Sequence, residues 1–299
     1  MIRFLLGLSL MISVVLYAAF QGPLLKSILS LPLASLFEVT LLYLVSQIVS
    51  AVKWYLVLRS LSEKTSFIEC LRAYFLGMYV NSFGLGIVGG DLVRAFAITV
   101  DSKKKAIASV LFDRIHGLFV LALLGGVAGI LSLPSKQLSF VFVPGCQILI
   151  AVITFSLFFS RAPLTFLSKF SSLQKLNEIV GLGWAIKLGD FLKISLISLV
   201  FHVLQLFALL IFSLRIGVEL DVFFWLSVMP LVNIVSALPI SWNGMGTREA
   251  LMMFYMTPTP FNATEIILFS MIWLSAVMVG SFIGALWSLF HNLNVKNRT

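Results

Sequence analysis

Two stretches of the sequence place an arginine and a carboxylate inside apolar surroundings. The two stretches are residues 81–94 (NSFGLGIVGGDLVR) and residues 238–249 (LPISWNGMGTRE). Fixed charge and glycine-rich backbone are tolerated at membrane depth only where protein buries them or where they line a wet cavity. Arg94 and Arg248 are therefore expected to bind phosphate, while Asp91 and Glu249 orient the arginines or sense protons. The two stretches predict the paired tips of one substrate site for an anionic headgroup.

The glycines of each stretch are expected to let the chain reverse and to precede a helix on the return. Asp91 and Thr247 suit the N-cap positions of these two helices. The free amides and positive dipole ends of both helices would then face an anion from opposite sides. The direction from acid to arginine differs by only about 40° between the two helices, at 3.6 residues per turn. An alternative stays open, in which each acid neutralises its own arginine while it caps the helix.

The same reasoning extends the site to neighbouring polar and small residues. Asn81 and Asn243 are expected to hydrogen-bond headgroup oxygens, and the glycines bring backbone amides close to the ligand. The complete set of residues predicted to bind the substrate is Asn81, Gly89, Gly90, Asp91, Arg94, Asp113, Arg114, Asn243, Gly244, Gly246, Arg248 and Glu249.

Asp113 and His116 stand three residues apart, so their side chains can touch on one face of a helix. They could form the base and partner of a catalytic dyad or belong to an ion-pair cluster near the lipid headgroups, and the sequence leaves both interpretations open. The sequence has no metal-binding spacing and no nucleophile elbow, and its GLGIVG match to the dinucleotide fingerprint lacks the strand that such a site needs. We therefore expect a transporter rather than an enzyme, with no catalytic residue, metal or cofactor.

Composition limits the elements that can position these residues. The chain has 60% apolar and 11% charged residues with a mean hydropathy of +1.07, whereas a soluble domain carries about 25% charged residues. We predict an all-α polytopic membrane protein. The net charge of +9 is carried mainly by short loops between apolar runs, which orients helices in a bilayer and does not predict nucleic-acid binding. Most basic residues fall on the side of the N-terminus, so we expect a multi-pass protein of the cell (inner) membrane with a cytoplasmic N-terminus.

Apolar runs and their basic flanks predict the elements in order. Spans are expected at about 3–20, 36–58, 106–131, 139–159, 193–214 and 265–290. Lys53, Arg59 and Lys64 are interpreted as the basic end of the second span. Residues 67–98 have basic residues at both ends but are too short for two crossings of about 20 residues each, so they predict a re-entrant hairpin that turns at the glycines. Residues 222–256 are broken by prolines and glycines and predict a second hairpin.

These elements predict a single transmembrane domain over residues 1–299. Its first half, 1–159, holds the hairpin 67–98, and its second half, 193–299, holds the hairpin 222–256. Residues 160–192 would form an amphipathic interfacial linker between the halves. After an N-terminal helix, the span–hairpin–span pattern then occurs twice with inverted topology, as in many secondary transporters with a midplane site. We expect Arg94 and Arg248 to share one polar chamber at that site.

Three motifs of the sequence can be compared with known families. They are Gly89-Gly90-Asp91-Leu-Val-Arg94-Ala, Asp113-Arg114-Ile-His-Gly117-Leu and Pro239-Ile-Ser-Trp-Asn-Gly244-Met-Gly246-Thr-Arg248-Glu249-Ala. These motifs resemble the family named for the transmembrane region of lysylphosphatidylglycerol synthase, also called the flippase-like domain family. The resemblance covers nearly the whole chain, although family members often have proline where this sequence has Phe83-Gly84.

The resemblance implies an integral membrane domain that moves lipids between leaflets, in some members fused to a soluble aminoacyl-transferring domain. The sequence stops at Thr299, so we expect no such enzymatic domain here. The predicted function is a flippase-like translocase that moves an anionic phospholipid or a polyprenyl-phosphate-linked lipid as its two hairpins rock.

Functions of other classes remain open. One is a membrane-embedded enzyme that modifies a lipid with Asp113 and His116, another is a scaffold for a separately encoded transferase, and a third is a transporter of a soluble solute. The expected partners are membrane lipids with anionic headgroups and, for the scaffold, a membrane or soluble transferase. Nucleic acid is not expected as a partner.

Overall fold

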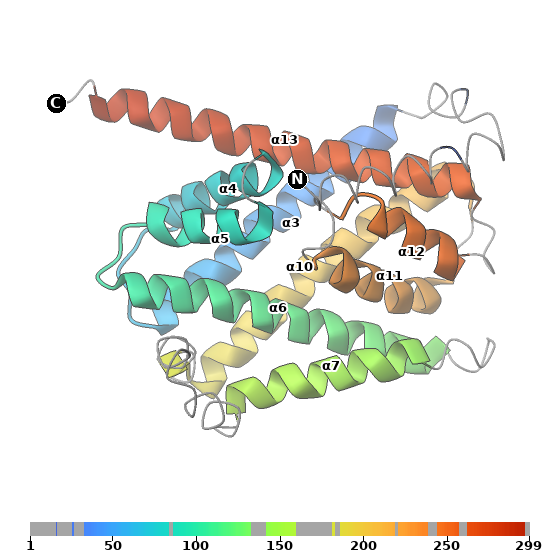
Figure 1. Ribbon diagram of the computed structural model, residues 1–299, viewed down its shortest axis with the longest axis horizontal. Coiled ribbons are helices and arrows are strands. Elements are labelled where there is room, and N and C mark those ends of the chain that lie inside the picture. The colour runs from blue at the N-terminus through green and yellow to red at the C-terminus, as the bar shows by residue number, and fades with distance from the viewer. Residues whose placement is uncertain are drawn as a thin grey trace. The chain divides into compact units, whose positions relative to one another are not determined.

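The computed structural model describes residues 33–83, 86–132, 142–159, 181–182, 186–218, 221–238, 244–256 and 262–296, together with Leu16 and Lys26. Within these ranges the regular secondary structure is entirely helical (Figure 1). The helices are α3 (Leu33–Ser60), α4 (Phe67–Phe83), α5 (Gly86–Ala97), α6 (Lys103–Ser132), α7 (Phe142–Phe159), α10 (Leu188–Arg215), α11 (Val222–Ser236), α12 (Thr247–Met256) and α13 (Ala263–Lys296).

Four of these helices are long and apolar enough to cross a membrane, namely α3, α6, α10 and the Ala263–Leu289 part of α13. The prediction of an all-α polytopic membrane protein is confirmed. The expected spans agree with the helices to within three residues except at two places: α10 begins at Leu188, inside the segment expected as a linker, and α13 continues to Lys296, beyond the expected end at 290. The expected first helix, 3–20, and most of the expected linker, 160–192, lie outside the described residues.

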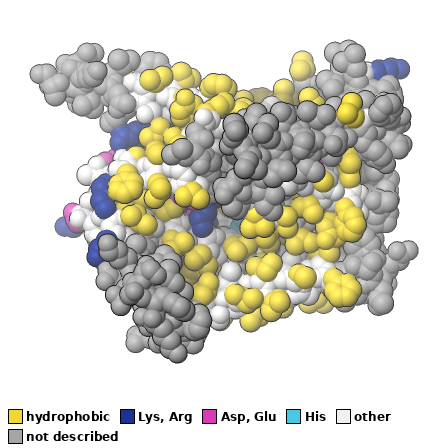
Figure 2. Space-filling model, viewed as in Figure 1, with side chains coloured by type: hydrophobic (Ala, Val, Ile, Leu, Met, Phe, Trp, Pro, Cys, Tyr) yellow, Lys and Arg dark blue, Asp and Glu magenta, His cyan; other side chains and the backbone are white. Residues whose placement is uncertain are grey.

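Apolar side chains are exposed along the long helices, as expected where lipid replaces water. Figure 2 shows hydrophobic side chains spread over the described surface on one face. Exposed examples are Phe37 of α3, Ile130 of α6, Leu196 of α10 and Phe282 of α13. Several charged and polar side chains are buried instead, among them Lys53, Arg94, Asp113, His116 and Gln147. A soluble protein rarely exposes so much apolar surface, so this partition agrees with a lipid environment.

The chain folds into two compact units, each with one helical hairpin. Unit 1 comprises Met1–Val45, Leu124–Gln147 and Val203–Val279, and unit 2 comprises Ser46–Leu123, Ile148–His202 and Gly280–Thr299. Unit 1 contains α11 and α12, and unit 2 contains α4 and α5. Each long helix contributes one part to each unit, so neither unit is a continuous stretch of sequence.

In unit 2, α4 and α5 form the first predicted hairpin (Figure 1). The arms have 17 and 12 residues, at or below the length of about 17 that a membrane crossing requires. The two arms approach so closely at Gly90 that an added Cβ there would overlap the carbonyl oxygen of Gly77 and Oδ1 of Asn81. The expected N-cap at Asp91 is wrong, since α5 already begins at Gly86. Gly90 therefore serves close packing between the arms and does not turn the chain.

In unit 1, α11 and α12 form the second hairpin. Asp221 caps α11 by accepting a hydrogen bond of 3.1 Å from the backbone amide three residues further on. Gly244 and Gly246 precede α12 with φ values of +76° and +77°, which glycine adopts without steric cost. The expected N-cap Thr247 is instead the first residue of α12. The amide of Gly246 donates to Glu249 Oε2 over 2.6 Å, which is the acidic half of a capping box.

We predict that Gly90→Ala lowers the free energy of unfolding in detergent by about 1–3 kcal/mol, because an added Cβ has no room beside a backbone carbonyl. Gly145→Ala in α7 is the matched control, since nothing lies within 4 Å of its added Cβ. That change should be neutral or stabilise by up to about 1 kcal/mol. Thermal unfolding measures both variants, and a Gly90→Ala protein as stable as the control would contradict the close contact.

Candidate functional site

Three buried charged side chains of unit 2 form a triad: Lys53 of α3, Asp113 of α6 and Arg94 of α5. Lys53 Nζ lies 2.9 Å from Asp113 Oδ1, and Arg94 Nη2 lies 2.8 Å from Asp113 Oδ2. The side chains are only 4–5% exposed. Lys53 Nζ also donates to the backbone carbonyl oxygen of Asp113 over 3.2 Å. Two cations thus share one buried carboxylate.

The members of the triad lie well inside their helices. Asp113 lies about 15 Å along α6 from its first residue, and Lys53 lies about 10 Å before the end of α3, at 1.5 Å per residue. Both helices are long enough and apolar enough to span a membrane. Charged side chains at that depth are rare and mark functional sites by default.

Two aromatic rings also contact the guanidinium of Arg94. Its Cζ lies 4.4 Å from the centroid of the Trp54 ring and 5.1 Å from that of Tyr74. Trp54 Nε1 donates to Ser109 Oγ over 2.9 Å, and the Tyr74 hydroxyl donates to Ser50 Oγ over 2.8 Å. Both rings are therefore fixed in place, and they contribute cation–π contacts to a desolvated cation.

A second ion pair, next to the triad, joins α5 to α6. Arg114 Nη2 lies 2.7 Å from Asp91 Oδ1, and its Nε donates to Asp91 Oδ2 over 2.8 Å. This is the bidentate geometry that arginine and carboxylate favour. Asp91 and Arg94 of α5 thus pair with Arg114 and Asp113 of α6, and not with each other. The alternative that each acid neutralises its own arginine is wrong for this hairpin.

The charges of this cluster do not cancel. Lys53, Arg94 and Arg114 are cations, and Asp91 and Asp113 are carboxylates, so three positive and two negative charges leave one positive charge. No other carboxylate of the described residues forms an ion pair with these cations. Arg94 Nε is also buried without a hydrogen-bond partner among them. The cluster has both the charge and a free N–H group to bind an anion.

Asn81 of α4 lies beside this cluster in the same hairpin. Its Oδ1 is buried next to Gly90 and has no hydrogen-bond partner in the part of the chain that the structure describes. Gly89 and Gly90 are buried as well. Asn243 lies outside the described residues.

In unit 1, Arg248 has different surroundings from those of Arg94. Its Cζ lies 6.0 Å from the centroid of the Trp273 ring of α13, and no described carboxylate forms an ion pair with it. Glu249 instead caps α12 through Gly246. The predicted chamber shared by Arg94 and Arg248 involves both units, and it stays a prediction.

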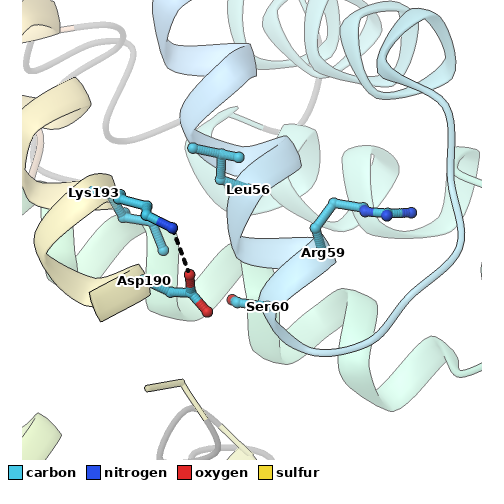
Figure 3. Close-up of a pocket in the computed structure, with 6 residues that line it drawn as sticks. Leu56, Arg59, Ser60, Asp190 and Lys193 are labelled. Carbon is cyan, nitrogen blue, oxygen red and sulfur yellow. Dashed lines mark ion pairs between the residues drawn. The ribbon is translucent and has the colours of Figure 1, made fainter. Parts of the chain in front are cut away.

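A surface cavity of about 280 Å³ lies in unit 2 between the end of α3 and the start of α10 (Figure 3). Lys193 and Asp190 form an ion pair of 3.6 Å there, and Arg59 points away from that pair. Asp190 in the first turn of α10 and Arg59 in the last turn of α3 complement the dipoles of their helices. The residues that line the cavity are Leu56, Arg59, Ser60, Asp190, Lys193 and Ile194. It contains none of the predicted site residues.

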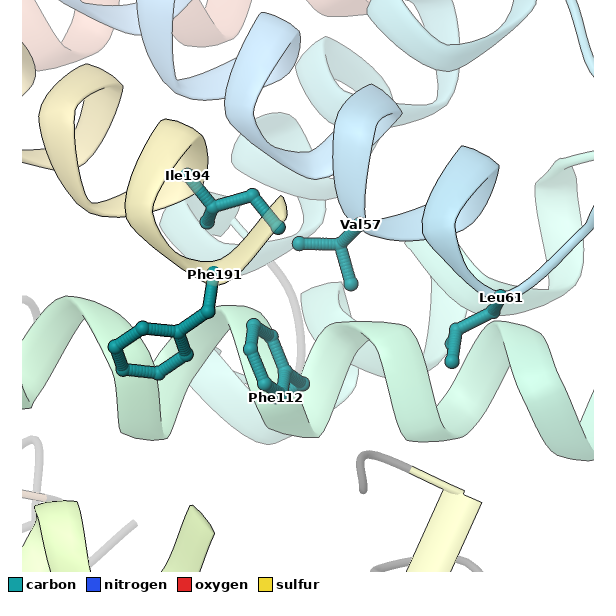
Figure 4. Close-up of a cluster of buried hydrophobic side chains, with 5 residues drawn as sticks. All are labelled: Val57, Leu61, Phe112, Phe191 and Ile194. Carbon is teal, nitrogen blue, oxygen red and sulfur yellow. The ribbon is translucent and has the colours of Figure 1, made fainter. Parts of the chain in front are cut away.

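His116 is packed among aromatic rings. It stacks on Phe112 with 5.4 Å between ring centroids and meets the edge of Phe191 at 5.0 Å. Its Nε2 lies 2.9 Å from Ser195 Oγ, whereas the carboxylate of Asp113 faces the two cations of the triad. The hydrophobic cluster beside it comprises Val57, Leu61, Phe112, Phe191 and Ile194 (Figure 4). The structure gives Asp113 and His116 different polar partners.

Lys53 is the member of the cluster that was not among the predicted site residues. The sequence places it inside an apolar run, where an ionisable residue should count as a functional candidate. Counting the basic residues placed Lys53 in the membrane, but Arg59 and Lys64 follow it closely, so it was interpreted as marking the end of the second span and was left out of the predicted site.

Residues 2–285 match the family model described as the lysylphosphatidylglycerol synthase TM region. The chain belongs to this family. The three motifs that suggested the lysylphosphatidylglycerol synthase TM region all lie within the matched residues, and that expectation is confirmed. Membership indicates a lipid-related function in the membrane. The comparison with curated proteins found no match, and neither did the comparison with solved structures.

We predict that Asp113→Asn lowers the free energy of unfolding by about 3–5 kcal/mol, because it leaves buried cations without their carboxylate. Asp91→Asn is the matched control, because Arg114 is 47% exposed and water can solvate it after the change. An exposed pair contributes only about 0–1 kcal/mol. Thermal unfolding in detergent compares the two variants, and equal losses would show that the triad is no more buried than its neighbour.

Proposed function

We propose that this protein is a lipid translocase that moves an anionic phospholipid or a polyprenyl-phosphate-linked lipid between membrane leaflets. The observation that carries the proposal is the Lys53–Asp113–Arg94 triad, in which two buried cations share one carboxylate. The family supports a role with membrane lipids. Transport, and not catalysis, is the function that we propose for this site.

An anion is the ligand that this charge distribution favours. An uncompensated charge in a poorly solvated site costs several kcal/mol, and a phosphate with one negative charge would cancel the excess. Arg94 offers its unpartnered Nε–H, and Lys53 can rotate its three N–H groups toward a ligand. Hydrogen bonds between such cations and phosphate are about twice as strong as neutral ones.

The hairpin provides a means for a headgroup to reach a buried site. Its arms pack closely at the Gly77–Gly90 contact, so α4 and α5 would move together, and that motion would also break the hydrogen bond between Tyr74 of α4 and Ser50 of α3. Two ion pairs, Asp91–Arg114 and Arg94–Asp113, join the hairpin to α6. An incoming phosphate can replace Asp113 as the partner of Arg94 and so release one of these connections. In our proposal this exchange opens the site to a leaflet.

The second hairpin would serve the other leaflet. Arg248 is free of ion pairs among the described residues and lies against Trp273, so its guanidinium has N–H groups left for a phosphate. The inverted topology predicted by the sequence would present the two hairpins to opposite faces of the inner membrane, with a cytoplasmic N-terminus. The lipid would pass from one arginine to the other as the hairpins rock.

We predict that Arg94→Gln and Arg248→Gln each lower the rate of lipid flipping by about ten- to hundredfold, because a hydrogen bond to a charged group contributes about 1.5–3 kcal/mol. The assay uses phosphatidylcholine proteoliposomes with a trace of phosphatidylglycerol that carries a nitrobenzoxadiazole label on its acyl chain. Dithionite bleaches the label in the outer leaflet and so reports the flipping rate.

Arg59→Gln is the control, because Arg59 is exposed at the end of α3 and should leave the rate unchanged. Each variant is first checked for a single peak in gel filtration. Wild-type rates in folded Arg94→Gln protein would remove the triad from the transport path.

A further inference from the structure

We propose that Lys53 is a proton-binding site that couples lipid transport to a proton: it takes up one proton when an anionic headgroup binds and gives it up when the headgroup leaves. This inference rests on the proposed transport function and adds the coupling ion. It follows from the partners of Lys53 and from the charge balance of the triad.

The charge balance gives the triad two neutral states. With Asp113 ionised and Arg94 charged, the pair is neutral, and a charged Lys53 adds the unbalanced positive charge. A bound headgroup with one negative charge would balance it. Without that headgroup, the same balance is reached if Lys53 is an uncharged amine that still donates to the backbone carbonyl oxygen of Asp113. Burial penalises every other combination by several kcal/mol.

Lys53 is the cation of the triad that can make this change. A guanidinium keeps its proton in proteins, whereas a lysine amine in a buried site readily changes its protonation state. In its charged form the amine also has a cation–π partner, because its Nζ lies 5.9 Å from the ring centroid of Phe201 in α10. Arg94 therefore supplies a fixed charge for the phosphate, and Lys53 supplies a charge that depends on the ligand.

Other titratable groups surround the triad, and their contacts differ from those of Lys53. His116 Nε2 lies 2.9 Å from Ser195 Oγ, and His202 Nε2 donates to the carbonyl of Gly117 over 3.1 Å. Arg114 is paired with Asp91. The titratable and charged groups around the triad and its neighbouring ion pair are Asp113, Arg114 and His116 of α6, Arg94 and Asp91 of α5, Tyr74 and Cys70 of α4, and His202 of α10.

The step balances without any further reactant. On one side of the membrane the amine of Lys53 takes a proton from water and becomes an ammonium as the phosphate binds. On the other side the phosphate leaves, and the ammonium returns its proton to water. One proton and one negative headgroup cross together, so no net charge moves. A pH gradient should drive this transport, and a membrane potential should not.

The experiment measures how a pH gradient shifts the leaflet distribution of the labelled phosphatidylglycerol probe in phosphatidylcholine proteoliposomes. One-to-one coupling predicts that the probe accumulates about tenfold, per pH unit of gradient, in the leaflet that faces the alkaline side. A potassium gradient with valinomycin should leave the distribution unchanged. A probe that equilibrates but ignores the pH gradient overturns the proton coupling and leaves transport intact. A probe that does not equilibrate at all refutes the proposed function itself.

Lys53→Arg assigns the coupling to its residue, because arginine keeps the charge and cannot release the proton. Transport by this variant should ignore the pH gradient and follow the membrane potential, whereas Lys64→Arg, an exposed control at the same end of α3, should behave as wild type. A Lys53→Arg protein that still follows the pH gradient overturns the assignment.

If that variant does not fold, a second experiment uses the wild-type protein. It measures the protons taken up in weak buffer when dihexanoyl phosphatidylglycerol binds. About one proton per probe molecule supports the proposal, and none overturns it.

Discussion

The sharing of the Asp113 carboxylate by Lys53 and Arg94 is the interaction on which the rest of unit 2 depends. Burying a charge is tolerable only with a partner close by, so three helices must bring their side chains to one point. The surrounding polar contacts serve that requirement: Trp54 and Tyr74 cover the guanidinium and are themselves held by hydroxyl groups. The glycine contact inside the hairpin places α5 close enough to take part.

The two hairpins handle charge in different ways. In unit 2 the arginine is enclosed by a carboxylate, a lysine and two aromatic rings. In unit 1 the carboxylate of Glu249 caps a helix, and Arg248 lies half-buried against Trp273. The two arginines therefore differ in their partners: Arg94 shares a carboxylate with Lys53, whereas Arg248 has no ion pair among the described residues.

Much of the fold could be predicted from the sequence, because apolar length and basic flanks are local properties. These properties predicted the spans, and they predicted the hairpin of α4 and α5 because that segment is too short for two membrane crossings. The choice of ion-pair partners could not be predicted in the same way. A spacing of three residues shows that Asp91 and Arg94 lie on neighbouring faces, but the register between α5 and α6 decides that they pair with Arg114 and Asp113. The start of α5 was missed for a related reason, since glycines inside a helix are favoured only by the contact that they permit with another helix.

The most direct test of the account is a cryo-electron microscopy map of the protein in nanodiscs that contain phosphatidylglycerol. We expect phosphate density in contact with the amine of Lys53 and the guanidinium of Arg94, with Asp113 still forming an ion pair with one of them. Lipid phosphates found only at the helix ends, with Lys53 and Arg94 both still paired to Asp113 in every class of particles, would contradict a headgroup site at the triad.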